Sequence, residues 1–225
     1  MKKYSILKLI LVGVITIMTA GCSNKVNLSK QAEEALQIKY NESFTVSDFI
    51  KKSGDYYTVY ASSKNYPDIT FYADVNSDGK DVSDTYAAKR LGLKISNIVN
   101  QSLKDFDGEY FVYSHPMIEN FYTNNADISI EDFVATFPSN TFDINVYVDK
   151  ESQDIEKIYD LLSVVPSKLG TMKGSINVCL VNSGLINEIK AAIEETDDLT
   201  SNTYKKLVLD SQTVHISFEN GITKD

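Results

Sequence analysis

The sequence predicts an α+β protein with mixed or antiparallel sheets, helices packed on one face and two subdomains. Three observations lead to this prediction. The composition, with 43% hydrophobic and 24% charged residues, is typical of a globular chain. Apolar residues recur at every second position in some segments and at every third or fourth position in others, and the two kinds of segment alternate along the chain. Residues 115–125 break both periods, contain Pro116 and three asparagines, and indicate a junction between two halves.

The first 21 residues have the pattern of a secretory signal peptide. Lys2, Lys3 and Lys8 precede the apolar run 9–18, and small residues follow it. The alternative is a membrane-spanning helix, but residues 9–21 would extend only about 20 Å as a helix, against a hydrocarbon core of ~30 Å. We therefore expect this segment to be removed rather than to span the membrane.

The end of that segment, Thr19-Ala20-Gly21-Cys22, resembles the lipobox of bacterial lipoproteins. In this family the cysteine thiol receives a diacylglycerol and the chain is cut just before it. Ala20, Gly21 and Cys22 match the pattern, whereas Thr19 stands where Leu, Val or Ile is usual. The resemblance implies that Cys22 carries acyl chains such as palmitate and anchors the protein to the cell membrane, facing outside the cytoplasm; two chains suffice for stable anchoring. An ordinary signal peptide with an unrelated cysteine is the alternative.

The chain is acidic, with 22 Lys+Arg against 31 Asp+Glu and a formal net charge of −9. Removal of residues 1–21 takes away three lysines and no acid, which brings the net charge to about −12. Such a chain lacks the basic face of a general nucleic-acid binder, and any partner that it recognises by charge should be cationic. Residues 22–27 are expected to form a tether, in which Ser23–Asn27 spans at most about 18 Å, so the folded part should stay close to the bilayer.

Residues 28–115 are expected to form an N-terminal α+β unit. It opens with a helix over residues 28–40, in which small and apolar residues share one face. Strands are predicted at residues 44–49, 56–61, 68–75 and 109–114. The third strand alternates cleanly and places on one side Ile69, Phe71, Ala73 and Val75. A helix over residues 82–106 carries an apolar stripe made by Ala87, Leu91, Ile95, Ile98 and Val99.

Residues 128–225 are expected to form a C-terminal α+β unit. Its helices are predicted at residues 130–137, 154–164 and 185–195. Ser129 caps the first of them, and the second carries a stripe made by Ile155, Ile158, Tyr159 and Leu162. Strands are predicted at residues 141–148, 175–181, 207–210 and 213–218. The first strand faces inward with Phe142, Ile144, Val146 and Val148. The order of these elements favours a sheet with helices on one face.

The segment Asp74-Val75-Asn76-Ser77-Asp78-Gly79-Lys80 resembles the start of a calcium loop of the EF-hand or dockerin type. Oxygen ligands at positions 1, 3 and 5 and Gly at position 6 match that pattern. The match ends at position 12, where Thr85 replaces the bidentate acid, and the preceding segment is a strand rather than a helix. A polar turn between a strand and a helix, capped by Asp81 or Ser83, explains the same residues. We therefore assign no metal ligand and keep calcium as an alternative.

Residues that could support catalysis are few and scattered. The two histidines are His115, in the expected junction, and His215, which should face solvent beside Ser217. The chain contains no His-Glu-x-x-His motif and no Gly-x-Ser-x-Gly motif. Cys179 lies inside an apolar strand, where a buried core thiol is expected rather than a nucleophile. We therefore assign no catalytic residue, expect no cofactor and favour a protein that is not an enzyme.

Tyrosines are abundant, and Tyr56, Tyr60, Tyr66 and Tyr72 could share an exposed sheet face. Such a face suits protein or glycan recognition, although strand propensity alone also explains these residues. The segments around them are similar to those of small predicted lipoproteins of Gram-positive bacteria, over roughly residues 1–115. The similar segments are Lys39–Val46, Tyr57–Ala61, Pro67–Phe71 and Asp78–Lys80. This resemblance implies no activity, but it makes the last segment a general feature of a strand–turn–helix unit.

One functional hypothesis and two alternatives follow. The leading hypothesis is a membrane-anchored extracytoplasmic lipoprotein, not an enzyme, that binds a protein or another component of the cell envelope. The first alternative is a small envelope hydrolase, which requires His115 or His215 within hydrogen-bond reach of a serine, cysteine or carboxylate in a cleft. The second alternative is a calcium-dependent adhesion or sensor module.

Overall fold

The computed structural model describes residues 27–117, 123–139, 141–152, 154–196 and 201–224. The expected signal peptide, the expected lipidation site Cys22 and all but the last residue of the expected tether lie outside the described residues. Within the described residues, no helix is both long enough and apolar enough to cross a membrane.

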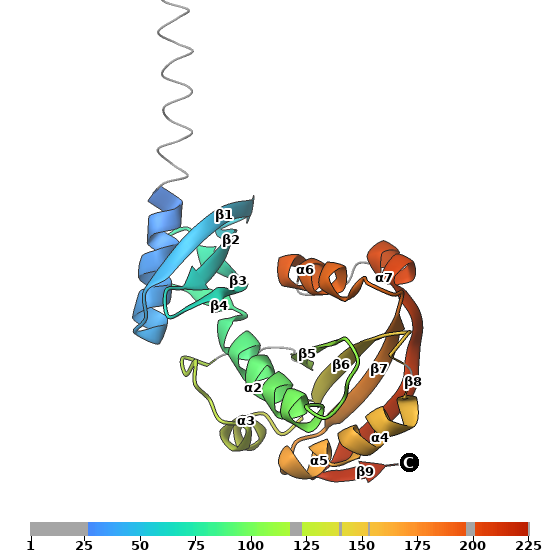
Figure 1. Ribbon diagram of the computed structural model, residues 1–225. Coiled ribbons are helices and arrows are strands. Elements are labelled where there is room, and N and C mark those ends of the chain that lie inside the picture. The colour runs from blue at the N-terminus through green and yellow to red at the C-terminus, as the bar shows by residue number, and fades with distance from the viewer. Residues whose placement is uncertain (1–26, 118–122, 140, 153, 197–200, 225) are drawn as a thin grey trace, which may run out of the picture. The chain divides into compact units, whose positions relative to one another are not determined.

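The predicted α+β class is confirmed: helices accompany one antiparallel sheet and one mixed sheet (Figure 1). The chain divides into two compact units, Met1–Asp84 and Thr85–Asp225. This division lies well before the junction expected between residues 115 and 128. The helix and strand that follow Thr85 join the second unit because their apolar side chains belong to its core.

Unit 1 contains a helix over residues 27–40 and a four-stranded sheet, sheet A. The strands run antiparallel in the order β1 (Phe44–Ser53), β2 (Tyr56–Ser63), β3 (Tyr66–Asn76) and β4 (Val82–Asp84). The predicted inward face of β3 is confirmed, since its four residues are at most 7% exposed. Residues 82–84 were expected to begin a helix, but they pair with β3 as a strand.

A buried ion pair connects β4 to the helix over residues 27–40. The carboxylate of Asp84 is fully buried and accepts hydrogen bonds at 2.8 Å from Lys39 Nζ and at 2.8 Å from the Tyr40 hydroxyl. Lys39 Nζ also donates to the carbonyl oxygen of Val82 at 3.3 Å. These contacts explain why residues 82–84 stay with sheet A, because a helix starting there would remove the carboxylate from its partners.

Unit 2 contains a five-stranded mixed sheet, sheet B, in the order β5-β6-β7-β8-β9. The strands are β5 (Tyr110–Met117), β6 (Thr141–Asp149), β7 (Gly174–Val181), β8 (Val208–Glu219) and β9 (Ile222–Lys224). The helices are α2 (Tyr86–Ser102), α3 (Ile130–Thr136), α4 (Ile155–Ser163), α5 (Val165–Lys168), α6 (Ile186–Thr196) and α7 (Ser201–Leu207). Strands β6 and β7 are parallel and are joined through α4 and α5, while the other neighbours are antiparallel.

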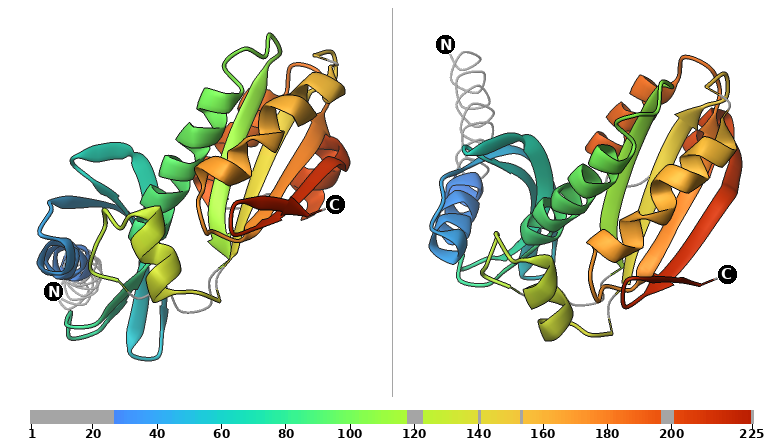
Figure 2. Two further views of the ribbon diagram at one scale, coloured as in Figure 1. Left: turned by 90° about the horizontal axis from the view of Figure 1, so that it is seen from below. Right: turned by 60° about the horizontal axis from the view of Figure 1, so that its bottom comes forward.

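Helices cover both faces of sheet B, where the sequence predicted helices on one face (Figure 2). On the first face, α2, α4 and α5 pack with the inward residues of β6, as predicted. On the second face, α6 and α7 pack on Tyr147, Cys179 and Val181. These apolar residues alternate along their strands with the residues of the first core and therefore point to the opposite face of the sheet. Helices on that face are needed to bury them.

Local details of unit 2 agree with the sequence in part. Ser129 caps α3 as predicted, because its hydroxyl accepts a hydrogen bond from the backbone N–H of Asp132 at 3.0 Å. Tyr159, expected in the apolar stripe of α4, is 44% exposed. The two strands expected at residues 207–210 and 213–218 form the single strand β8, which directly follows α7.

Candidate functional site

The second face of sheet B has a part that helices cover and a part that carries polar side chains. Two rows of strand partners make up the polar part. The first row runs across β5 to β8 through His115, Asp143, Ser175 and Ser217. The second row, one pleat nearer the covered part, contains Tyr113, Asn145, Asn177 and His215. We call these eight residues the polar face.

Side-chain hydrogen bonds link the polar face across three strands. Ser175 Oγ donates to Asp143 Oδ1 at 2.8 Å, and Asn177 Nδ2 lies 3.3 Å from Asn145 Oδ1. His215 Nδ1 lies 2.7 Å from Asn177 Oδ1. Because each bond joins neighbouring strands, the side chains are held in fixed orientations before any ligand arrives.

His215 completes this network. Its Nε2 lies 2.9 Å from the hydroxyl of Ser217, and its side chain is exposed, as the sequence predicted. The Asn177 amide oxygen can only accept, which assigns the imidazole proton to Nδ1 and leaves Nε2 to accept from Ser217. Hydrogen bonds therefore link Ser217 to His215 and His215 to Asn177.

His115 lies on β5 rather than in a junction between domains. Its ring stacks on Tyr113, with centroids 5.3 Å apart and planes at 27°. Among the described residues, its Nδ1 atom is buried without a hydrogen-bond partner. The sequence predicted this strand at residues 109–114, and Pro116 obscured its continuation to Met117; proline is tolerated here because β5 is an edge strand.

The serine–histidine–asparagine array meets only part of what a hydrolase requires. Histidine could remove the Ser217 proton, and Asn177 would orient the ring. Within the array His215 is exposed, and Asn177 and Ser217 are half-buried. Ser217 pairs with residues on both β7 and β9, so backbone N–H groups around it are engaged in the sheet. Hydrolases of this kind gain much of their rate from water exclusion and from N–H donors to the oxyanion, and strand pairing already uses backbone groups beside Ser217.

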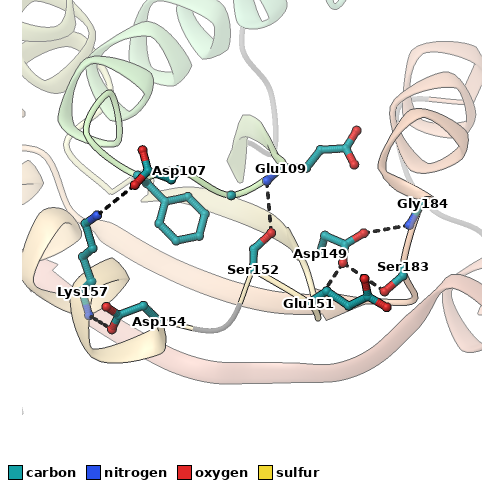
Figure 3. Close-up of a pocket in the computed structure, with 11 residues that line it drawn as sticks. Asp107, Glu109, Asp149, Glu151, Ser152, Asp154, Lys157, Ser183 and Gly184 are labelled. Atoms are coloured by element: carbon teal, nitrogen blue, oxygen red, sulfur yellow. Dashed lines mark hydrogen bonds and ion pairs between the residues drawn. The ribbon is translucent and has the colours of Figure 1, made fainter.

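A cavity of about 680 Å³ lies at the carboxyl ends of the parallel strands β6 and β7 (Figure 3). This is the edge at which ligands bind in many sheets with parallel strands. Five acidic residues and one lysine are among the eleven lining residues, which are Phe106, Asp107, Gly108, Glu109, Asp149, Glu151, Ser152, Asp154, Lys157, Ser183 and Gly184. Among the described parts of the chain, no three His, Cys, Asp or Glu residues are arranged to hold a metal ion.

Asp149 uses its carboxylate to join the loops around this cavity. The side chain accepts hydrogen bonds from Gly184 N at 2.7 Å, Glu151 N at 2.9 Å and Ser183 Oγ at 3.1 Å (Figure 3). The backbone N–H groups of Glu151 and then Gly184 lower the pKa of Asp149 below its ordinary value. Both carboxylate oxygens are therefore engaged by the protein, which indicates a structural role.

Comparisons with known proteins support the fold of this chain. No family model matches the chain, and no curated protein matches it. A solved structure does match. It is the crystal structure of a DUF5037 family protein from Ruminococcus gnavus, with a TM-score of 0.66 and 16% sequence identity. The match covers 88% of this chain and 94% of that chain, and at this identity it shows the fold alone.

Replacement of Asp149 should destabilise unit 2 in a pH-dependent manner. We expect Asp149→Asn to lower the free energy of unfolding by about 1–3 kcal/mol at pH 7, since an amide cannot accept all three hydrogen bonds. The pKa of Asp149 is depressed in the folded state, so its stabilisation is complete above the unfolded value of about 3.9 and is lost as the pH falls through the folded value. Denaturant titrations from pH 7 to pH 3 should show the two proteins converging.

Asp107→Asn provides the matched control for that experiment. Asp107 lines the same cavity, but its side chain is fully exposed and its nearest cation, Lys157 Nζ, lies 3.9 Å away. We expect this variant to stay within about 0.5 kcal/mol of the wild type. Equal losses in the two variants would contradict the structural role of Asp149.

The segment that resembled a calcium loop is a hairpin turn between β3 and β4, not a turn into a helix. Asn76 Oδ1 accepts from the backbone N–H groups of Lys80 and Asp81, at 2.9 and 3.1 Å. Asp78 Oδ1 accepts from Lys80 N, which is the first cause of its lowered pKa, and Asp74 accepts from Thr58. These oxygens thus bind the protein itself, as in a polar turn. The expected cap is also wrong: α2 begins after Thr85 without a side-chain cap.

Two further features singled out from the sequence are the tyrosines of sheet A and Cys179. Tyr56, Tyr66 and Tyr72 are 40% to 48% exposed, and Tyr60 pairs directly with Tyr72 across β2 and β3. Cys179 is 3% exposed within the core under α6, as predicted for a core thiol. The tyrosines belong to unit 1, so they are not part of the polar face.

Proposed function

We propose that this protein is a lipid-anchored, extracytoplasmic binding protein without enzymatic activity. The observation that carries the binding role is the polar face, a preorganised array of side chains on a sheet. Among its eight residues there is no lysine, arginine or glutamate. Interaction surfaces are depleted in lysine and glutamate and rich in aromatic residues, whereas an ordinary solvated sheet face carries many long charged side chains.

The anchor rests on the lipobox resemblance of residues 19–22. Cys22 would hold the chain at the membrane, and the short tether would keep unit 1 near the surface. The net negative charge argues against nucleic acid as a partner. We therefore place the partner among the components of the cell envelope.

A small envelope hydrolase is the second candidate, and one observation favours it. His215 lies within hydrogen-bond reach of both Ser217 and Asn177. The exposure of His215 to solvent makes binding the better-supported function. Labelling of Ser217 by a serine-reactive phosphonate would reverse that order.

Replacement of the proposed anchor should change where the protein resides. We expect Cys22→Ser to abolish lipidation, because the serine hydroxyl is not a thiolate nucleophile. The protein should then either remain as an unprocessed precursor or leave the membrane after cleavage. Fractionation of cells and immunoblotting would measure this, with Cys179→Ser as the control that should stay membrane-bound. Unchanged processing and membrane retention of Cys22→Ser would contradict the anchor.

A further inference from the structure

We propose that the polar face binds a neutral glycan strand of the cell wall. This inference rests on the proposed function and deepens it by naming the ligand class. The face spans four strands, or about 14 Å at ~4.8 Å per strand spacing, which is long enough for a short oligosaccharide. On one side it meets the aromatic stack of Phe111 and Tyr147, and on the other the ion pair of Lys173 and Glu219 at 2.9 Å.

The charge of the face favours a neutral ligand. Asp143 is its one acidic residue, and that carboxylate already accepts a hydrogen bond from Ser175 at 2.8 Å. A cationic ligand would need more unengaged acids, and a polyanion would need lysines or arginines that the eight residues lack. The acidic balance of the whole chain repels polyanions further.

The hydrogen-bonding groups of the face suit hydroxyl-rich ligands. Each sugar hydroxyl is both a donor and an acceptor, and the asparagines, histidines and serines offer both kinds of partner. The hydrogen bonds from Asn145 to Asn177 and from Asn177 to His215 orient these side chains, and their remaining donors and acceptors are available to a ligand. Tyr113 stacks on the His115 ring and packs at the border of the covered part, so the two rings brace this end of the polar face.

Other occupants fit this surface less well. An amphipathic helix requires an apolar groove, and an extended peptide adds to a strand edge rather than to the face of a sheet. The proposed anchor would hold the chain within the envelope, where the sugar backbone of the wall's glycan strands is an abundant uncharged polymer of hydroxyl and acetamide groups. We therefore commit to that source.

Photo-crosslinking in intact Gram-positive cells tests this inference on the full-length protein. Asn177 is replaced by p-benzoylphenylalanine, which inserts into nearby C–H bonds on irradiation. We expect a high-mass adduct in the wall fraction that a muramidase converts to small species and a protease leaves attached to glycan. The same photoreactive residue at Leu93, which is 48% exposed on α2, should give no such adduct.

The other outcomes separate the inference from the proposed function. A protein adduct that resists the muramidase overturns the glycan and leaves the binding role standing. A crosslink from residue 177 to residues 27–84 of the same chain, or equal yields at residues 177 and 93, overturns the polar face as a ligand site. Release of the protein into the medium overturns the membrane anchor and hence the proposed function.

A second variant guards against misfolding caused by the bulky photoreactive group. Purified lipidated protein in detergent is sedimented with washed, insoluble cell wall. Asn177→Ala should weaken binding about tenfold, because it removes hydrogen-bonding groups and frees His215 to rotate. Asn97→Ala, on the exposed side of α2, should bind like the wild type. Equal binding by the two variants would overturn the inference.

Discussion

Asp84→Ala should destabilise unit 1 by about 3–5 kcal/mol, the largest effect that we expect from a single substitution. The Asp84 side chain is fully buried and the Lys39 side chain is 12% exposed, so the ammonium group would lose its counter-ion in a place that water hardly reaches. The Tyr40 hydroxyl would lose an acceptor at the same time. Hydrogen exchange measured by mass spectrometry on peptides from residues 27–84 would report the change, because it reads unit 1 separately.

A double variant separates two contributions to this loss of stability: the loss of the ion pair itself and the cost of leaving the Lys39 charge buried without a partner. Asp84→Leu combined with Lys39→Met removes both charges and keeps the volume nearly constant. We expect it to be clearly more stable than Asp84→Ala, since no buried charge is left alone. A loss below about 1 kcal/mol for Asp84→Ala would show that the pair is solvated and would contradict the structure.

Gly92→Ala should destabilise unit 2 by about 3 kcal/mol, although alanine is the better helix former. A Cβ at this position would overlap the carbonyl oxygen of Ser114 and lie 3.2 Å from its carbonyl carbon. The obstacle is backbone rather than a flexible side chain, so α2 would have to move away from β5. The buried hydrogen bond of 3.1 Å between Ser96 Oγ and Ser114 Oγ would be strained by that movement. Chemical denaturation of unit 2 would measure the loss.

Asn97→Ala on the same helix is the matched control. Asn97 is exposed, so the substitution should raise stability by a few tenths of a kcal/mol through helix propensity alone. Opposite signs for the two alanine variants would confirm that α2 approaches β5 closely at Gly92. A gain of stability in both would contradict that contact.

Much of the secondary structure could be predicted because its signals are local. The alternation that ends at Val75 and the capping residue Ser129 both lie within the segments that they define, and both predictions are confirmed. Strand β4 was missed because Val82 also fits the apolar pattern of the following helix. What decides its state is Lys39, more than 40 residues away in sequence.

The boundary between the units could not be predicted for a related reason. Pro116 and the asparagines after it gave a strong local signal of a junction, yet residues up to Met117 belong to β5. The position of α2 in unit 2 depends on Leu91, Ile95 and Val99 packing against sheet B, which is a long-range contact. Local composition carries no information on which sheet a helix will cover.

The polar face was missed because its residues are far apart in sequence. Each of Asn145, Asn177 and His215 is a single polar residue on an alternating strand, which is unremarkable alone. Only the register of β6, β7 and β8 brings them into one row. The neighbouring Ser217 was considered beside His215, but not with a partner on β7 that orients the ring.

We propose that this chain is displayed outside the cytoplasm by a lipid on Cys22. Mass spectrometry of the N-terminal peptide, from protein extracted from cell membranes, tests it most directly. We predict a chain that begins at Cys22 and carries a thioether-linked diacylglycerol. A mature chain that begins at another residue, or an unmodified Cys22 thiol, would contradict the claim.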